Sequence, residues 1–386
     1  MTNSWMTPSR RDLLRAGAVG GAMAAGSPLV SAGALPLSAG LARKTKRVVV
    51  IAFAGGVRSK ETFGSPENVP NMQAMANEGV LYPRLRTANL GHFGATTSIF
   101  TGIAEQRGIR ENARGPDPTV FEYLRKDLAL AREDVWITTS GGAQQTNYAY
   151  GLHPEYGPKY GANTLDGDGI FNRQFQELLG RYGKPGMLPE GEQGILDGLR
   201  KSIGGGPDAV REAESQARVE EYILGELSRG TSDITGAAAG DRKALRLARN
   251  LLSLFKPKVI GVVLQNADTA HGSFNGYVEV IRRNDAAIGE LMEAIREDEE
   301  LRESTAVFVL PEFGRDKDLN SRRGLDHGDG SDDLRYVTGV AWGPDFRKGK
   351  VVEEDQRVSD ITTTVCDLFG ADAKFARGRS LRGLYS

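Results

Sequence analysis

The sequence predicts an α/β fold in which helices flank a doubly wound, mostly parallel sheet. Short apolar runs rich in β-branched residues alternate with helical patterns along most of the chain. Glycine is frequent, at 49 of 386 residues, as tight turns between strands and helices require. Two of the apolar runs, 259–264 and 305–310, stop at turns that carry carboxylates and histidine, as strands do at the carboxyl edge of a parallel sheet.

The composition is that of a soluble globular protein. Hydrophobic residues make up 39% of the chain, charged residues 26%, and the net charge is -1. This balance gives no overall basic field, so we expect no nucleic-acid partner. The lone cysteine, Cys366, excludes an intramolecular disulfide and a thiolate metal cluster, and we expect it to be a buried structural thiol.

The N-terminal segment, residues 1–42, has the pattern of a twin-arginine export signal. The run SRRDLL at 9–14 carries the arginine pair, and a weakly apolar run rich in Gly and Ala follows. Pro28 and Pro36 interrupt that run, so we expect no stable membrane span after processing. A disordered basic tail is the alternative. We therefore predict the twin-arginine export machinery as a partner, a periplasmic or secreted location, and one α/β domain over residues 43–386.

Six short runs are predicted strands. The first, at 48–54, has the continuous apolar pattern of a strand that is buried on both faces. The first run, VVVIAFA, stops at Gly55 and Gly56. The predicted strands are residues 48–54, 80–87, 134–139, 259–264, 305–310 and 337–342.

Helical patterns lie between these strands. Gly79 ends the first predicted helix, and Pro118 is expected near the first turn of the second. In the longest one, Ile281, Ile288 and Leu291 fall on one face. The predicted helices are residues 71–79, 118–127, 212–228, 241–255, 277–298 and 360–369.

Residues 146–206 are rich in Gly, Tyr, Asn and Pro and are predicted to be an irregular insertion. Two short helices are expected within it, at 171–182 and 190–203. Long structured loops of this kind often carry substrate contacts or lids. No motif in the insertion identifies a substrate.

Candidate site residues lie in the turns that follow two of the strands. Asp268 and His271 follow the run at 259–264, whereas Glu312 and His327 follow the run at 305–310. Because neighbouring parallel strands end at one edge of a sheet, we expect these side chains to lie close together.

Two further residues complete the candidate set. His92 lies in a glycine-bounded turn, GHFG, before a predicted helix. It is either a hydrogen-bonded turn histidine or part of the site. Asp326 precedes His327 and either orients that ring or is a solvated loop acid.

Five short motifs occur in the order found in one known superfamily. They are VVVIAFAGG (48–56), VPNMQAMANEGVLY (69–82), GHFGATTSIFTG (91–102), the segment beginning DTAHG (268–292), and VSDITTTVCDLFGADAKFARGRSL (358–381). The chain thereby resembles the alkaline-phosphatase-like superfamily, which includes sulfatases, phosphodiesterases and cofactor-independent phosphoglycerate mutases. The sequences EFGR and LDHG, together with the export signal, resemble a poorly characterised exported branch of that superfamily.

The resemblance implies one intact metal site. Members of the superfamily usually hold two metal ions at the carboxyl ends of the strands, and the residues of the first site match Asp268, His271 and His327. Oxygen and imidazole ligands with an open position suit Zn²⁺ or a similar divalent ion. Asp268 has the structural alternative of capping the turn after its strand.

The same resemblance implies that the second site is degraded. Ala54 stands at the position of a ligand Asp, and Phe313 at the position of a ligand histidine. His92 falls on the position of the nucleophile, where relatives carry a hydroxyl or thiol side chain. Glu312 is then a general base or an extra ligand, or else it pairs with Arg315 or Arg58.

These points predict an exported, metal-dependent, hydrolase-like protein. It is expected to act on a phosphate or sulfate ester through a reduced, mononuclear site, with His92 and Glu312 as catalytic residues. The partner is then a small anionic ester or a component of the cell envelope. The alternative is a non-catalytic descendant of the fold that binds a ligand or an envelope partner, and the missing hydroxyl nucleophile favours it.

Overall fold

The computed structural model describes residues 43–109, 113–140, 145–166 and 234–385, which fall in one compact unit, Arg43–Ser386. The predicted export signal and the predicted helices at 171–182, 190–203 and 212–228 lie outside the described residues and stay predictions. Within the described part of the chain, no helix is long and apolar enough to cross a membrane.

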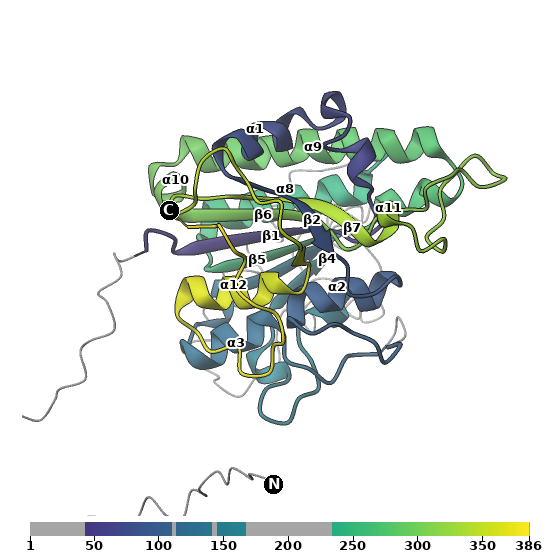
Figure 1. Cartoon of the computed structure of the whole chain (residues 1–386). Helices are drawn as coiled ribbons and strands as arrows, with labels where there is room; N and C mark the ends of the chain where they lie inside the picture. The colour runs from purple at the N-terminus through teal and green to yellow at the C-terminus, as the bar shows by residue number, and fades with distance from the viewer. Residues whose placement is uncertain (1–42, 110–112, 141–144, 167–233, 386) are drawn as a thin grey trace, which may run out of the picture. The chain divides into compact units, whose positions relative to one another are not determined.

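A nine-stranded sheet lies at the centre of the described residues (Figure 1). Its strands run in the order β4-β3-β5-β1-β6-β7-β2-β8, and β9 also pairs with β2. The bounds are β1 (Arg47–Phe53), β2 (Val80–Arg86), β3 (Val135–Thr139), β4 (Asn163–Asp166), β5 (Val259–Leu264), β6 (Thr305–Pro311), β7 (Tyr336–Trp342), β8 (Lys350–Val351) and β9 (Gln356–Arg357).

The predicted mostly parallel sheet is confirmed. The central pairs β5–β1 and β1–β6 are parallel, and β7 alone runs against its neighbours β6 and β2. Every residue of β1, β5 and β6 is buried, as their continuous apolar sequences predict. The prediction that 146–206 is irregular is wrong at β4, which pairs in parallel with β3. Its sequence, NTLD, has no apolar run, so pairing with β3 decides its structure.

Helices cover both faces of the sheet (Figure 1). One core contains residues of α1 (Pro70–Glu78), α8 (Ala239–Phe255) and α9 (Phe274–Glu297) together with side chains from one face of the sheet. A second core contains residues of α2 (His92–Thr101), α3 (Val120–Asp127) and α12 (Asp360–Phe369) with the opposite face. This arrangement is the doubly wound architecture that the alternating sequence predicts.

Helix boundaries differ from the prediction by a few residues. The helix expected from Pro118 begins instead at Val120, because Thr119 caps it: the Thr119 backbone N–H donates to the Glu122 carboxylate at 2.7 Å. The predicted apolar face of α9 is confirmed, with Ile281, Ile288 and Leu291 all buried. Short helices α10 (Glu299–Ser304) and α11 (Asp332–Arg335) precede β6 and β7.

A buried carboxylate fixes the turn that follows β5. Asp241, in the first turn of α8, accepts hydrogen bonds from the backbone N–H groups of Gln265 (2.8 Å) and Asn266 (3.1 Å). It also accepts one from Asn284 Nδ2 of α9 at 2.7 Å. Burial raises the pKa of Asp241 to about 6. The carboxylate therefore ties two helices to the residues that open η8 (Asn266–His271), the turn that carries Asp268.

Replacing Asp241 with Ala is expected to lower the free energy of unfolding by about 3 kcal/mol. The Asn266 N–H and Asn284 Nδ2 lose their acceptor, whereas the Gln265 N–H keeps the Ser140 hydroxyl oxygen. Urea denaturation followed by circular dichroism measures the change. Asp241→Asn keeps one side-chain oxygen and is expected to lose less. A wild-type midpoint for Asp241→Ala would show that the carboxylate does not hold this turn.

Candidate functional site

The candidate site lies where the central strands end. Beyond β1, the Ala54 N–H donates to the Leu264 carbonyl of β5, and the Glu312 N–H donates to the Phe53 carbonyl at 3.1 Å. The three strands thus stop at one level of the sheet. The turn η8 follows β5, and the loop that begins with Glu312 follows β6. His92 is the first residue of α2.

Three histidines from these segments face one another. His92, His271 and His327 each offer a ring nitrogen, and these nitrogens all lie within 4.8 Å of one another. The ring centroids of His92 and His327 are 4.8 Å apart, and those of His271 and His327 are 5.1 Å apart. We refer to these three residues as the histidine cluster.

An oxygen atom holds Nδ1 of each ring in the histidine cluster. Such a bond fixes the orientation of the ring and leaves Nε2 to bind a ligand. The pairs are His92 with Glu312 Oε1 at 2.6 Å, His271 with Asp326 Oδ1 at 2.6 Å, and His327 with the Leu90 carbonyl at 2.9 Å.

Glu312 is fully buried and its two oxygens serve two groups. Oε1 contacts His92 Nδ1, and Oε2 accepts a hydrogen bond from the Thr96 hydroxyl, one turn further along α2. Burial opposes the positive charge on His92, but the carboxylates of Glu312 and Asp268 outweigh it and raise the pKa of His92 to about 10. Burial raises the pKa of Glu312. The two side chains therefore hold a proton between His92 Nδ1 and Glu312 Oε1 inside the protein.

His92 Nε2 is a buried polar atom of the site that lacks a hydrogen-bond partner in the described part of the chain. It lies 3.0 Å from Asp268 Oδ1, an ion pair by distance, yet it is buried without a well-directed hydrogen bond to any described residue. A buried nitrogen without a bonding partner often marks a position for a ligand or an ion.

Asp268 lies beside the cluster and contacts a buried arginine. Its Oδ1 accepts a hydrogen bond from Arg315 Nη2 at 2.6 Å and lies 3.3 Å from His271 Nε2. Burial opposes the charge on Asp268, but His92 and Arg315 outweigh it and hold the pKa of this carboxyl well below its usual range. For His327, burial and the neighbouring positive charge of His92 lower the pKa, so this ring is neutral at pH 7.

The donor set fits a divalent metal ion. Three neighbouring imidazoles whose Nδ1 atoms are held by oxygens are a ligand set that occurs in metal sites with an open position. The cluster shares His271 and His327 with the set predicted from the sequence. It adds His92, whereas Asp268 is paired with Arg315.

The partners of Asp326 and Glu312 differ from those considered in the sequence analysis. Asp326 does not orient His327, because its carboxylate contacts His271. Glu312 contacts His92 and Thr96 rather than forming an ion pair with an arginine. Arg58 instead pairs with the buried Glu61 at 2.6 Å.

Arg315 and Thr96 contact the site, and the sequence reasoning assigned neither a role in it. Both lie within the motifs that carry the resemblance, but nothing in their spacing shows which way they point. Phe313 is buried, and its ring centroid is 4.9 Å from that of His92 and 5.1 Å from that of His327. An apolar ring thus packs against the histidine cluster at position 313, where the resemblance implies a ligand histidine in relatives.

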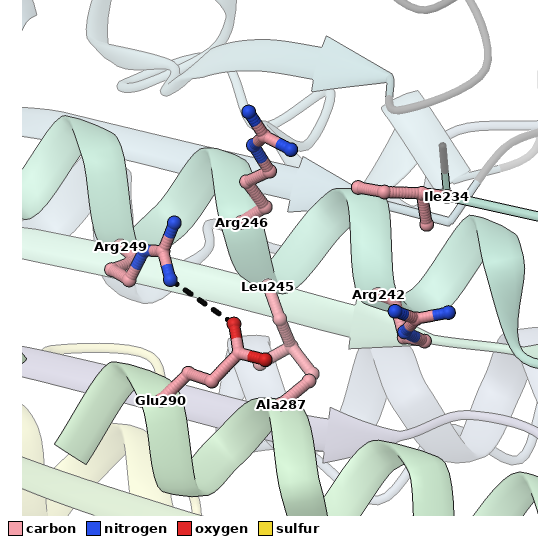
Figure 2. A pocket seen from close by; sticks show the side chains of 7 residues that line it. All are labelled: Ile234, Arg242, Leu245, Arg246, Arg249, Ala287 and Glu290. Carbon is pink, nitrogen blue, oxygen red and sulfur yellow. Dashed lines mark hydrogen bonds and ion pairs between the residues drawn. The ribbon is translucent and has the colours of Figure 1, made fainter. Parts of the chain in front are cut away.

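A separate cavity of about 130 Å³ lies between α8 and α9 (Figure 2). Arg249 and Glu290 form an ion pair of 3.0 Å across it. None of the predicted site residues lines it, and its wall consists of Ile234, Arg242, Leu245, Arg246, Arg249, Ala287 and Glu290. The candidate site is therefore assigned from the chemistry of the histidine cluster rather than from the size of a cavity.

No protein-family model and no curated protein matches the sequence. Solved structures do match the fold. A variant of the alkaline phosphatase PafA has a TM-score of 0.58 at 11% identity and covers 90% of this chain and 100% of its own. A putative sulfatase from Bacteroides thetaiotaomicron has a TM-score of 0.55 at 11% identity, covering 88% of this chain and 74% of its own.

A third match is a protein in the alkaline phosphatase superfamily from Vibrio parahaemolyticus, with a TM-score of 0.52 at 11% identity. It covers 90% of this chain and 72% of its own. Identities this low establish shared architecture and leave the activity to be argued from the site. The five sequence motifs and these matches agree, and the protein has the alkaline-phosphatase-like fold.

Proposed function

We propose that this protein is an exported hydrolase of phosphate or sulfate esters with a site for one divalent ion, Zn²⁺ or a similar metal. The histidine cluster carries the proposal, because an oxygen contacts each ring at Nδ1 and one ring nitrogen of each residue lies within 4.8 Å of the others. The fold shared with an alkaline phosphatase and a putative sulfatase supports the class of substrate. The twin-arginine pattern in residues 1–42 supports export to the periplasm or beyond.

A divalent ion held by the cluster would stabilise the negative charge that develops on ester oxygens during hydrolysis. His92, His271 and His327 would hold it through Nε2, because an oxygen contacts each Nδ1. His271 Nε2 lies 3.1 Å from Arg315 Nη1 and would have to give up this contact to bind an ion, whereas Arg315 Nη1 would keep the Leu325 carbonyl as an acceptor.

The carboxylates then have separate tasks. Glu312 is fully buried and bonded on both oxygens, so it orients His92 and does not meet the substrate. Asp268, whose side chain is 43% exposed, accepts a hydrogen bond from the attacking water and so orients it. These roles revise the expectation that Glu312 is a base and that Asp268 is a ligand.

A screen of aryl phosphates, phosphodiesters and aryl sulfates is expected to find turnover that requires a divalent ion and is lost in His271→Ala. The matched control is His153→Ala, because the fourth histidine is not part of the cluster and its ring packs at a tilt against Phe375, with ring centroids 4.3 Å apart. An ion-loaded protein without turnover on any of these classes would favour the non-catalytic alternative, in which the same site binds an anionic ligand or an envelope component.

The purified protein is expected to bind one Zn²⁺ per chain, measured by isothermal titration calorimetry and by elemental analysis after dialysis. Glu312→Gln is expected to weaken binding by about 10- to 100-fold, because the bond that orients His92 is altered. His327→Gln removes a ligand and is expected to cost more, whereas His153→Gln is expected to have no effect. Equal affinities for all four proteins would contradict the proposed ligand set.

The binding of Zn²⁺ is also expected to release about one proton per ion at pH 7.5. His92 has a pKa of about 10 and carries a proton at this pH, which the ion must displace from Nε2. Affinity therefore rises by about tenfold per pH unit between pH 7 and 8.5. Titration calorimetry in buffers of different ionisation enthalpy counts the proton. Release of no proton would place the ion on Asp268, His271 and His327, the set predicted from the sequence.

A further inference from the structure

Thr96 is a fully buried threonine whose hydroxyl contacts the candidate site. It lies one turn after His92 on α2, so positions 92 and 96 share one face of the helix. Thr96 Oγ1 donates a hydrogen bond to Glu312 Oε2, while Glu312 Oε1 contacts His92 Nδ1 at 2.6 Å. Two side chains of α2 therefore hold the two oxygens of one carboxylate.

The hydrogen bond of Thr96 differs from the one that hydroxyl side chains commonly form inside helices. Ser and Thr in a helix often donate to the carbonyl four residues earlier. Two hydroxyls of α2 do so, and the pairs are Ser98 with the Gly94 carbonyl at 2.7 Å and Thr101 with the Thr97 carbonyl at 2.9 Å. For Thr96 that carbonyl belongs to His92, and the hydroxyl donates to Glu312 instead. Thr96 thus links α2 to the loop that follows β6.

The main chain of Glu312 is fixed independently of Thr96. Its N–H donates to the Phe53 carbonyl of β1 at 3.1 Å, and its carbonyl accepts a hydrogen bond from the Thr87 hydroxyl at 2.7 Å. The freedom that is left to this residue is rotation of its side chain. A carboxylate that is bonded at one oxygen can still turn about that bond, whereas a donor at each oxygen fixes its plane.

Burial makes this second donor important. Glu312 has an exposed fraction of 0%, so bulk water does not reach its oxygens, and Thr96 is the one described residue that donates to Oε2. A buried charged oxygen without a donor is costly. Without the hydroxyl, the carboxylate would therefore turn towards another donor or take up a proton. Either change would alter the bond that orients the His92 ring.

We propose that Thr96 is a positioning residue for the histidine cluster: it fixes the plane of the Glu312 carboxylate, which in turn holds the His92 ring with Nε2 directed into the site. The inference rests on the proposed function for the effect on metal binding. The orientation of the His92 ring, by contrast, can be measured in the metal-free protein.

The first measurement is the proton NMR signal of the His92 ring N–H in the metal-free protein, assigned by its loss in His92→Gln. A strong bond to a carboxylate moves this signal downfield. The downfield signal is expected in the wild type and in Thr96→Ser, and is expected to move upfield or be lost by exchange in Thr96→Val. The matched control is Thr97→Val, because this buried neighbour has no hydrogen-bond partner for its hydroxyl among the described residues.

The second measurement is the affinity for Zn²⁺, determined by calorimetry. Thr96→Val is expected to weaken binding by about 3- to 10-fold, less than a change of Glu312, because Thr96 acts one residue further from the ion. Thr96→Ser and Thr97→Val are expected to bind as the wild type does. If Thr96 acts through Glu312, Thr96→Val causes no further loss of affinity in a Glu312→Ala protein.

A folded Thr96→Val protein with the wild-type signal and the wild-type affinity would overturn the inference. If this variant does not fold, Glu312→Ala is compared with Glu312→Ala/Thr96→Val. Equal affinities support the inference, whereas a further loss shows that Thr96 acts independently of Glu312 and overturns it. A wild-type protein that binds no Zn²⁺ would defeat the proposed function, while the signal of the His92 ring would still test the role of Thr96.

Discussion

The register in which β5, β1 and β6 pair is the constraint on which the rest of the site depends. Because these three parallel strands are hydrogen-bonded side by side and stop at one level, the chain that leaves each of them emerges at the same edge of the sheet. The segment that follows β5 is η8, and the segment that follows β6 is the loop that begins with Glu312. The segment that follows β1 contains Gly55 and Gly56, whose carbonyls accept hydrogen bonds from Arg315. A shift of one strand by a residue would turn its side chains to the opposite face and separate these groups.

Charge pairing is organised at this edge in a consistent way. Each of the three carboxylates makes its shortest contact with a different basic side chain: Glu312 with His92, Asp326 with His271, and Asp268 with Arg315. Buried charges are stable only when they are paired, so Glu312 and Asp268 balance the charges of His92 and Arg315, while Asp326 orients the His271 ring. The result is a group of ring nitrogens that face one another next to a fixed cation. Such an arrangement can hold a metal ion.

Much of the fold could be predicted from the sequence. The six predicted strands and the described helices match the structure to within a few residues, because their patterns record burial on one or both faces. The strand β4 was missed, since NTLD has no pattern of its own and depends on its neighbour β3. The start of α3 was misplaced because the capping contact of Thr119 and Glu122 outweighs the preference of Pro118 for a first turn.

For the site, the sequence by itself determined which chemistry-bearing residues follow the central strands, and the motifs indicated the superfamily whose fold the structure shows. Only the tertiary structure decided how these residues pair. The Asp326 carboxylate contacts His271 rather than His327. His92 lies in a cluster with His271 and His327, and Asp268 beside it forms an ion pair with Arg315. The reason is physical: a sequence pattern records which side of an element is buried, whereas ion pairs and ring orientations depend on side chains from segments more than 200 residues apart, such as His92 and Glu312.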